Sequence, residues 1–433
     1  MQKRLKIAVI GTGVAGLGAA WLLHEAHDIT VYEKNNYTGG HSNTHVTPGG
    51  SNVDTGFIVY NPATYPNFVA LMQHLKVETQ DSSMSFAVSL DNGALEYSGD
   101  NINTLFVQRK NLLKPRFHRM WIDIIRFYIE APKFLEKNPE STLTLGEYLV
   151  QRRYSDSLIN DHLLPMGAAI WSMTREGMLG FPLITFIRFC RNHGLLRLVD
   201  RPVWRTVTGG SRAYVTKLTE GYRARTRNNC GAVRIERTGE KAVILDSRGA
   251  REGFDHVIVA THADEALALL AKPSDDEARV LGAIRYSTNR AVLHQDLRLM
   301  PKNKKAWASW TYLGATPGPD PKVSLIYWMN RLQSLPLHNN YFVSLNPAIE
   351  PENILYETSY THPIYTKAVV EAQKDLCRIQ GVNRTWFCGS YCGYGFHEDA
   401  LSSGLTVAEN FGVKRPWQVE ESSIAAQNAR KAA

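Results

Sequence analysis

Three glycines near the N-terminus have the spacing needed to hold a dinucleotide. Lys6–Ile10 is an apolar run typical of a buried strand, and Gly11, Gly13 and Gly16 follow it directly. The first glycine of such a set permits a tight turn, the second lets backbone amides approach a pyrophosphate, and the third lets the next helix pack on the strand. We therefore predict a strand, a turn and a helix over 14–24 whose N-terminus binds phosphate.

A carboxylate and a second glycine pair narrow the choice of dinucleotide. Asp28–Glu33 reads as the next strand, and the carboxylate of Glu33 at its end is placed to accept hydrogen bonds from ribose hydroxyls. The pair Gly39–Gly40 is superfluous for a simple nicotinamide dinucleotide, but it suits a loop lying along the pyrophosphate of a longer, extended FAD. We therefore predict FAD as the cofactor.

These segments resemble the flavin amine oxidase and phytoene desaturase superfamily, and the resemblance covers nearly the whole chain. Thr385–Ser390 resembles the buried strand that ends at the flavin ribityl chain, and His397–Gly404 resembles the helix start that faces the pyrimidine edge of the ring. Cys230–Ile235 resembles the strand whose valine backbone holds the adenine, and Val53–Ile58 resembles the segment that passes the isoalloxazine. His41 stands where the superfamily usually has an arginine on phosphate, which makes that contact weaker or pH-sensitive.

The resemblance implies an α/β fold in which a Rossmann-like FAD-binding domain is interleaved with a mixed α+β substrate domain. We assign 1–80, 205–270 and 375–415 to the FAD-binding domain, 81–204 and 271–374 to the substrate domain, and 416–433 to a loose tail. The residues expected at the cofactor are Gly11, Gly13, Val14, Ala15, Gly16, Glu33, Lys34, Gly40, His41, Ser42, Gly56, Phe57, Ile58, Val233, Gly389, Ser390, Phe396, His397 and Ala400.

A narrower resemblance points to the substrate. Phrases scattered along the chain resemble a bacterial branch of FAD-binding proteins that is associated with cyclopropane- or methyl-fatty-acyl synthases. They include Met84–Val88, Asn192–Leu196, Thr261–Asp264, Ala306–Trp310, Tyr327–Gln333 and Gly395–Asp399. One type of member in that branch desaturates methylated acyl chains on the way to furan fatty acids. The resemblance therefore implies desaturation of methylated unsaturated acyl groups of membrane phospholipids.

Such a desaturation removes a hydride, which N5 of a flavin can accept, and a proton, which needs a base or an ordered water. Dioxygen can then reoxidise the flavin. The side chains expected to handle the proton are His397, Glu398, His193 and Tyr394. Each also has a structural alternative, which is helix capping for the first two and packing for the others.

Two other functions stay open at this stage. Amine oxidation is the activity that the wider superfamily implies, although a net charge of +8 suits anionic partners better than cationic substrates. A non-catalytic flavin protein that positions an acyl-modifying methyltransferase belongs to a different class. The two classes are distinguished by flavin reduction, because an enzyme reduces its own flavin on meeting its substrate.

The positive charge is partly concentrated in one stretch of chain. Arg116, Arg119 and Arg126 lie among aromatic and aliphatic residues, and we predict a helix near 117–130 that ends before Pro132. Its basic flank and apolar bulk suit the headgroup region of an anionic membrane. The alternative is a buried amphipathic helix with a solvated basic face. Nucleic acid is a poorer partner, because no recognised binding module is present.

The middle of the chain is rich in apolar and aromatic residues. Phe181–Leu183, Phe186–Cys190 and His193–Leu196 could line an elongated tunnel for an acyl chain or form an ordinary helical core. The five cysteines lack metal-type spacing, so we expect no structural metal and a reducing compartment. No uninterrupted apolar run is long enough to span a bilayer, and we expect a cytoplasmic protein peripheral to the inner face of the cell membrane.

Overall fold

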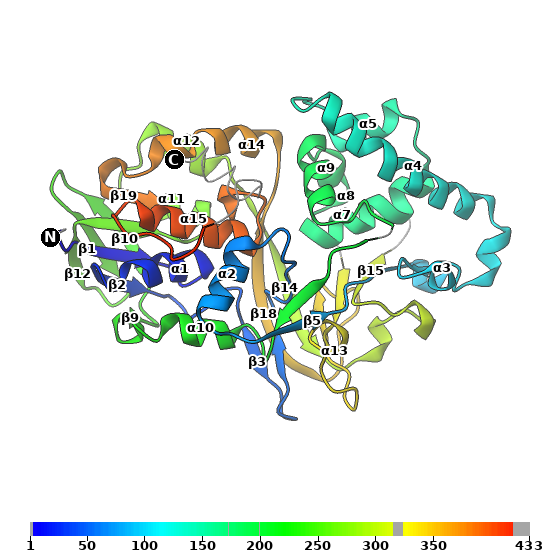
Figure 1. Cartoon of the computed structure of the whole chain (residues 1–433), viewed down its shortest axis with the longest axis horizontal. Helices are drawn as coiled ribbons and strands as arrows, with labels where there is room; N and C mark the ends of the chain where they lie inside the picture. The colour runs from blue at the N-terminus through cyan, green and yellow to red at the C-terminus, as the bar shows by residue number, and fades with distance from the viewer. Residues whose placement is uncertain (1–2, 172, 199, 315–323, 419–433) are drawn as a thin grey trace.

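The computed structural model describes residues 3–171, 173–198, 200–314 and 324–418. A parallel sheet lies at one end of the molecule, a group of helices lies at the other, and a larger mixed sheet lies next to both (Figure 1). The predicted tail is described as far as residue 418, and in this part Trp417 stacks on Trp21 with ring centroids 5.7 Å apart. Residues 419–433 lie outside the described part of the chain.

The parallel sheet has five strands in the order β19-β13-β1-β2-β9. They are β1 (Lys6–Ile10), β2 (Asp28–Tyr32), β9 (Thr226–Arg227), β13 (His256–Val259) and β19 (Thr385–Phe387). Its central strand β1 is apolar from residue 7 onward, as expected for a parallel strand that is covered on both faces. Strands from distant parts of the chain therefore complete one sheet, which confirms the interleaved α/β fold.

The mixed sheet has seven strands in the order β18-β14-β17-β16-β15-β6-β7. They are β6 (Phe86–Leu90), β7 (Leu95–Ser98), β14 (Tyr286–His294), β15 (Trp310–Gly314), β16 (Ser324–Trp328), β17 (Phe342–Leu345) and β18 (Ile354–Pro363). All neighbours are antiparallel except β15 and β6, which run parallel. Smaller sheets contain β3 (Thr44–Val46) with β4 (Asn52–Asp54), β5 (Thr79–Ser82) with β8 (Trp204–Val207), and β10 (Ala232–Arg237), β11 (Ala242–Asp246) and β12 (Arg251–Phe254).

The helices fall into two groups. Those near the parallel sheet are α1 (Val14–Leu23), α2 (Pro66–His74), α10 (Arg212–Thr219), α11 (Ala263–Leu269), α12 (Asp275–Gly282), α14 (Lys367–Lys374) and α15 (His397–Glu409). Those toward the other end are α3 (Ile102–Leu105), α4 (Pro115–Lys137), α5 (Leu145–Gln151), α6 (Asp156–Leu158), α7 (Leu164–Trp171), α8 (Arg175–Leu179) and α9 (Leu183–Asn192), while α13 (Met329–Leu332) follows β16. Figure 1 shows this separation.

The prediction that the basic helix ends before Pro132 is wrong. Helix α4 continues through this proline to Lys137. A proline inside a helix costs about 3 kcal/mol, because it removes a hydrogen bond and its ring meets the preceding turn. Ala131 and Leu135 flank the proline and are both buried, so packing of the apolar face offsets that cost and carries the helix onward.

The arginines of α4 contact carboxylates of the same group of helices. Arg116 lies 2.9 Å from Asp161, Arg119 lies 3.2 Å from Asp123, and Arg126 lies 3.0 Å from Glu130. The opposite face of the helix is buried. These contacts favour the buried amphipathic helix that the sequence offered as the alternative to a membrane-facing one.

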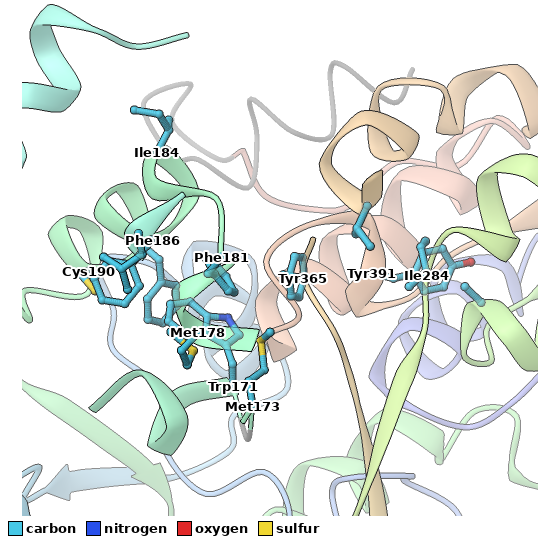
Figure 2. Close-up of a cluster of buried hydrophobic side chains, with 14 of the residues drawn as sticks. Trp171, Met173, Met178, Phe181, Ile184, Phe186, Cys190, Ile284, Tyr365 and Tyr391 are labelled. Carbon is cyan, nitrogen blue, oxygen red and sulfur yellow. The ribbon is translucent and has the colours of Figure 1, made fainter. Parts of the chain in front are cut away.

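Most of the aromatic residues in the middle of the chain form a core. Trp171 packs on Phe181 and Phe186, with ring centroids 4.6 and 5.8 Å away, and both phenyl rings are fully buried (Figure 2). Tyr365 continues this core toward the parallel sheet, and its hydroxyl donates to the carbonyl of Gly393 at 2.8 Å. These side chains therefore join the helical group to the rest of the molecule rather than lining a tunnel.

No helix in the described ranges is both long enough and apolar enough to cross a membrane.

Two helices of the parallel-sheet region touch through glycine. A Cβ at Gly404 of α15 would lie 2.0 Å from the carbonyl oxygen of Ala15 in α1, and one at Gly18 would lie 2.7 Å from Leu401. The glycines therefore allow the two backbones to approach, and the N-termini of α1 and α15 are held in a fixed relation.

We predict that Gly404→Ala lowers the free energy of unfolding by about 2–3 kcal/mol, because the added methyl group overpacks a backbone contact. Gly282→Ala in α12 is the matched control, since the nearest atom to its Cβ position is a leucine methyl 3.6 Å away. Denaturant unfolding of both variants checks this, and equal stability of the two would contradict the close helix contact.

Candidate cofactor and active site

The turn between β1 and α1 has the geometry of an anion cradle. Gly11 has φ +99°, and a Cβ there would lie 2.7 Å from the carbonyl oxygen of Ala260. Gly13, the residue before α1, has no atom within 4 Å of its Cβ position, and no side chain caps the helix. The first amides of α1 therefore face open space, as a bound pyrophosphate requires. Gly16 has no room for a Cβ, while Val14 and Ala15 are buried in the first turn.

Glu33 is held beside this turn. Its carboxylate accepts hydrogen bonds from the backbone N–H of Thr12 at 3.1 Å and from that of Asn35 at 2.8 Å. The N–H of Cys230 donates to the carbonyl of Glu33 at 2.8 Å, so the predicted adenine strand does lie next to the predicted ribose acid. Val233 is 50% exposed, and its role stays a prediction.

A second uncapped helix N-terminus lies at the start of α15. No side chain caps the first turn of this helix, while Asp399 accepts hydrogen bonds from the backbone of Tyr394 at 3.0 Å and of Phe396 at 2.9 Å. These bonds fix the approach to the helix. Asp399 was not among the site residues predicted from the sequence, although an acid at the third helical position is a recognisable signal. The N–H of Gly389 donates to Ser403 at 3.0 Å, which ties the Gly389–Ser390 turn to the same helix.

His397 is stacked and hydrogen bonded. Its ring lies parallel to that of Phe57 with centroids 3.7 Å apart, and Nε2 lies 2.8 Å from the hydroxyl of Tyr214, which also bonds Ser42. Burial lowers the pKa of His397 to about 3, so the imidazole is neutral. The structure thus brings together His397, Phe57 and Ser42, which lie far apart in the sequence.

Glu398 does not point into this region. Its two carboxylate oxygens accept hydrogen bonds from Asn67 at 2.8 and 2.9 Å and from the N–H of Phe68 at 2.9 Å. The carboxylate therefore caps the N-terminus of α2. Burial raises the pKa of Glu398 to about 7. These contacts favour a structural role over proton transfer, but the helix that Glu398 caps is α2 and not the flavin-facing helix that the sequence alternative concerned.

Four rings form a continuous wall beside the start of α15, which we call the aromatic wall. Phe396 stacks on Phe189 at 4.6 Å, Phe189 stacks on His193 at 3.8 Å, and His193 faces Trp204 at 6.2 Å between centroids. Nδ1 of His193 lies 3.0 Å from the carbonyl of Phe189 and donates to it, so Nε2 carries the lone pair. Burial lowers the pKa of His193 to about 4. The wall is therefore apolar except for the indole N–H of Trp204 and the neutral imidazole of His193, whose Nε2 is its one proton acceptor.

Tyr394 lies near the same helix start but has a different character. Burial raises the pKa of its phenol, and the guanidinium of Arg188 bonds it. The hydroxyl is therefore protonated at neutral pH and is not a base.

His41 belongs to a cluster of histidines that was not predicted from the sequence. Its ring lies 6.1 Å from that of His262 and 5.9 Å from that of His362, with Tyr360 packed against it at 4.7 Å. Burial and the neighbouring imidazoles hold the pKa of His41 well below its usual range. His41 is therefore neutral and does not replace the charge of the family arginine. No local sequence signal marks His262, at the start of α11, or His362, in β18, because only the fold brings these segments together.

The other predicted cofactor residues have varied placements. A Cβ at Gly40 would lie 3.1 Å from the Cα of Gly13, so this loop meets the phosphate turn as expected. A Cβ at Gly56 would lie 2.3 Å from the carbonyl of His41. Ile58 and Ala400 are buried, whereas Lys34 is exposed and pairs with Glu265 at 2.5 Å.

Two uncapped helix N-termini, a glycine turn and a ribose acid define an FAD-binding protein, and the residues present fit that cofactor. Residues 14–302 match the family described as flavin containing amine oxidoreductase, and the chain belongs to that family. It is an FAD-dependent oxidoreductase of the amine oxidase and desaturase superfamily.

One curated relative and several solved structures resemble the chain. The chloroplastic/chromoplastic zeta-carotene desaturase of Capsicum annuum is 33% identical over 76 residues, which are 17% of this chain and 13% of that protein. The CLA-producing fatty acid isomerase of P. acnes has a TM-score of 0.67 at 15% identity, covering 95% of this chain and 100% of the other. Cyclohexylamine oxidase of Brevibacterium oxydans IH-35A has a TM-score of 0.68 at 13% identity, covering 94% and 99%. The structural likenesses show the fold.

We predict that Gly13→Val abolishes FAD retention without unfolding the protein, because the added side chain enters the open space above the helix amides. Gly239→Val is the matched control, since Gly239 also has no atom within 4 Å of its Cβ position and lies outside the site. Flavin absorbance per protein after gel filtration should fall at least about tenfold in the first variant alone. Full occupancy in Gly13→Val would refute the phosphate cradle.

Proposed function

We propose that the chain desaturates methylated unsaturated fatty acyl groups, with membrane phospholipids as their source. The observation that carries this proposal is the aromatic wall, a stack of four rings beside the α15 N-terminus in which Phe396 and Trp204 are partly exposed and Phe189 and His193 are buried. A largely apolar lining of this kind suits an alkyl chain. The sequence phrases shared with the bacterial branch support the same substrate, and a fatty acid isomerase among the structural neighbours supports acyl chemistry on this fold.

The side chains have distinct tasks in this reaction. FAD supplies an acceptor for the hydride when it is bound. The aromatic wall orients the chain and excludes water from it, and the amides at the start of α15 stabilise negative charge at the cofactor. Nε2 of His193 accepts the proton, since it is the one basic atom in the wall and it has no hydrogen-bond partner among the described residues. His397 and Glu398 position α15 and α2.

The charges near the wall fit an amine substrate less well. An ammonium group needs a free carboxylate or an aromatic cage with polar recognition. Glu398 and Asp399, the acids at the start of α15, are both occupied by N–H donors. Amine oxidation is therefore the second candidate, supported by the family description.

We predict that phospholipids with methyl-branched monounsaturated chains bleach the flavin under anaerobic conditions and lose two hydrogens by mass. Putrescine and cyclohexylamine serve as comparison substrates in the same assay. If an amine bleaches the flavin and the lipid neither bleaches it nor loses hydrogen, amine oxidation replaces desaturation as the proposed function. An unreduced flavin with every substrate would instead favour the non-catalytic partner of a methyltransferase.

We predict that His193→Phe keeps the stack and the bound FAD but slows anaerobic flavin reduction at least about 100-fold, because the base is lost. Since the pKa of His193 is about 4, its wild-type contribution is constant at neutral pH and is lost as pH falls through 4. His162→Phe, at a second buried neutral histidine that contacts Tyr97, is the control. Equal rates of flavin reduction in the two variants would refute the role of His193 as the base.

A further inference from the structure

A basic and apolar surface lies away from the cofactor site, at the end of the molecule where α3 lies (Figure 1). It is formed by α3, by the turn η2 (Arg109–Leu113) and by the turn η6 (Lys304–Ala306) with the residues next to these turns. The side chain of Arg109 donates to Asn103 at 2.8 Å, which joins η2 to α3, and α3 also contacts η6. Three segments that are distant in sequence therefore form one surface, which we call the basic patch.

The lysines of the basic patch have no acidic partners. Its exposed lysines are Lys110, Lys114, Lys302, Lys304 and Lys305. None of the five lies within 4.0 Å of a carboxylate of the described chain.

The acids of the same region have partners of their own. Glu96 is buried and accepts the backbone N–H groups of Lys302 and Asn303, and Asp100 pairs with Arg331 at 2.8 Å. Asp91 is the one exposed acid within 91–114 and 300–305, both of which are fully described. The patch therefore has a large positive excess, unlike α4, whose arginines are paired.

Large apolar side chains project from the same turns. Leu113 is 88% exposed, and Ile102 is 78% exposed. A leucine at the tip of a short turn and flanked by lysines can enter the acyl boundary of a bilayer while the lysines contact headgroups. A soluble acidic protein would match the charge of the lysines. It would not by itself provide an apolar environment for the side chains of Leu113 and Ile102, which a bilayer provides.

We propose that the basic patch docks the protein on an anionic phospholipid bilayer, with Leu113 and Ile102 inserted and the five lysines at the headgroups. This docking is independent of the proposed chemistry. It differs from the sequence-based expectation, which placed the contact on the arginines of α4.

The test is cosedimentation of the FAD-loaded full chain with vesicles of saturated, unbranched phosphatidylcholine, with and without phosphatidylglycerol. Such lipids cannot be desaturated by the proposed reaction, so failure of that reaction leaves this test intact. We expect binding to the anionic vesicles alone, weakening as salt is added. Absence of binding to anionic vesicles would overturn the proposal.

Two pairs of variants locate the surface. Lys110→Glu with Lys305→Glu should lower the partition coefficient at least about tenfold. Lys241→Glu with Lys272→Glu makes the same charge change at two exposed lysines outside the patch and should have a much smaller effect. Equal decreases in the partition coefficient of the two double variants would show that binding depends only on the net charge of the protein, and would refute a specific patch.

The contribution of the exposed apolar side chains to membrane binding is tested separately. Leu113→Ser should weaken binding at least about threefold, whereas Val150→Ser, at a 76% exposed valine on α5, should not. Unchanged thermal unfolding and flavin content in each variant shows that the fold is intact. Binding that is indifferent to Leu113 would refute the insertion.

Discussion

The contact between α1 and α15 is the constraint on which the site depends. Gly404 lies against the backbone of Ala15, and Gly18 admits Leu401, so the two helices approach more closely than side chains would permit. The first helix begins at the phosphate turn, and the second begins beside the aromatic wall. Neither N-terminus has a side-chain cap, so each leaves its first backbone amides available to a ligand. The site for a long dinucleotide therefore depends on this helix pair.

Buried carboxylates connect this helix pair to the rest of the fold. Glu398 of α15 caps α2, and Asp54 at the end of β4 accepts hydrogen bonds from Ser211 before α10 and from Gln333 after α13. Burial raises the pKa of Asp54 to about 6, while its hydroxyl and amide partners stabilise the ionised form. Glu398 and Asp54 thus bind backbone N–H groups at the starts of helices that lie far from them in the sequence. The starts of α2 and α10 are thereby fixed by residues from other parts of the chain.

The features that the sequence predicted are those with local causes. Gly11 and Gly16 mark a turn with no room for a Cβ at either position, and the α15 start was recognisable because its motif is continuous. The histidine cluster and the capping of α2 by Glu398 were not predictable, since they join residues hundreds of positions apart. The helix end predicted before Pro132 was wrong because the prediction used a local rule. The tertiary burial of Leu135, which the rule does not include, stabilises the helix beyond the proline. The aromatic residues of the wall could be identified in the sequence, but their stacking against one another could not be predicted.

The order of the strands sets the order of events during synthesis. The phosphate turn at Gly11 leaves the ribosome early, but β19 and α15 are made only after residue 384. At translation rates of about 5–20 residues per second, the first half of the cofactor site waits tens of seconds for its second half. During that interval the apolar edge of β1 lacks its neighbour β13, and β13 in turn lacks β19. Capture of FAD therefore belongs to the end of folding, and the nascent chain is the form most exposed to aggregation.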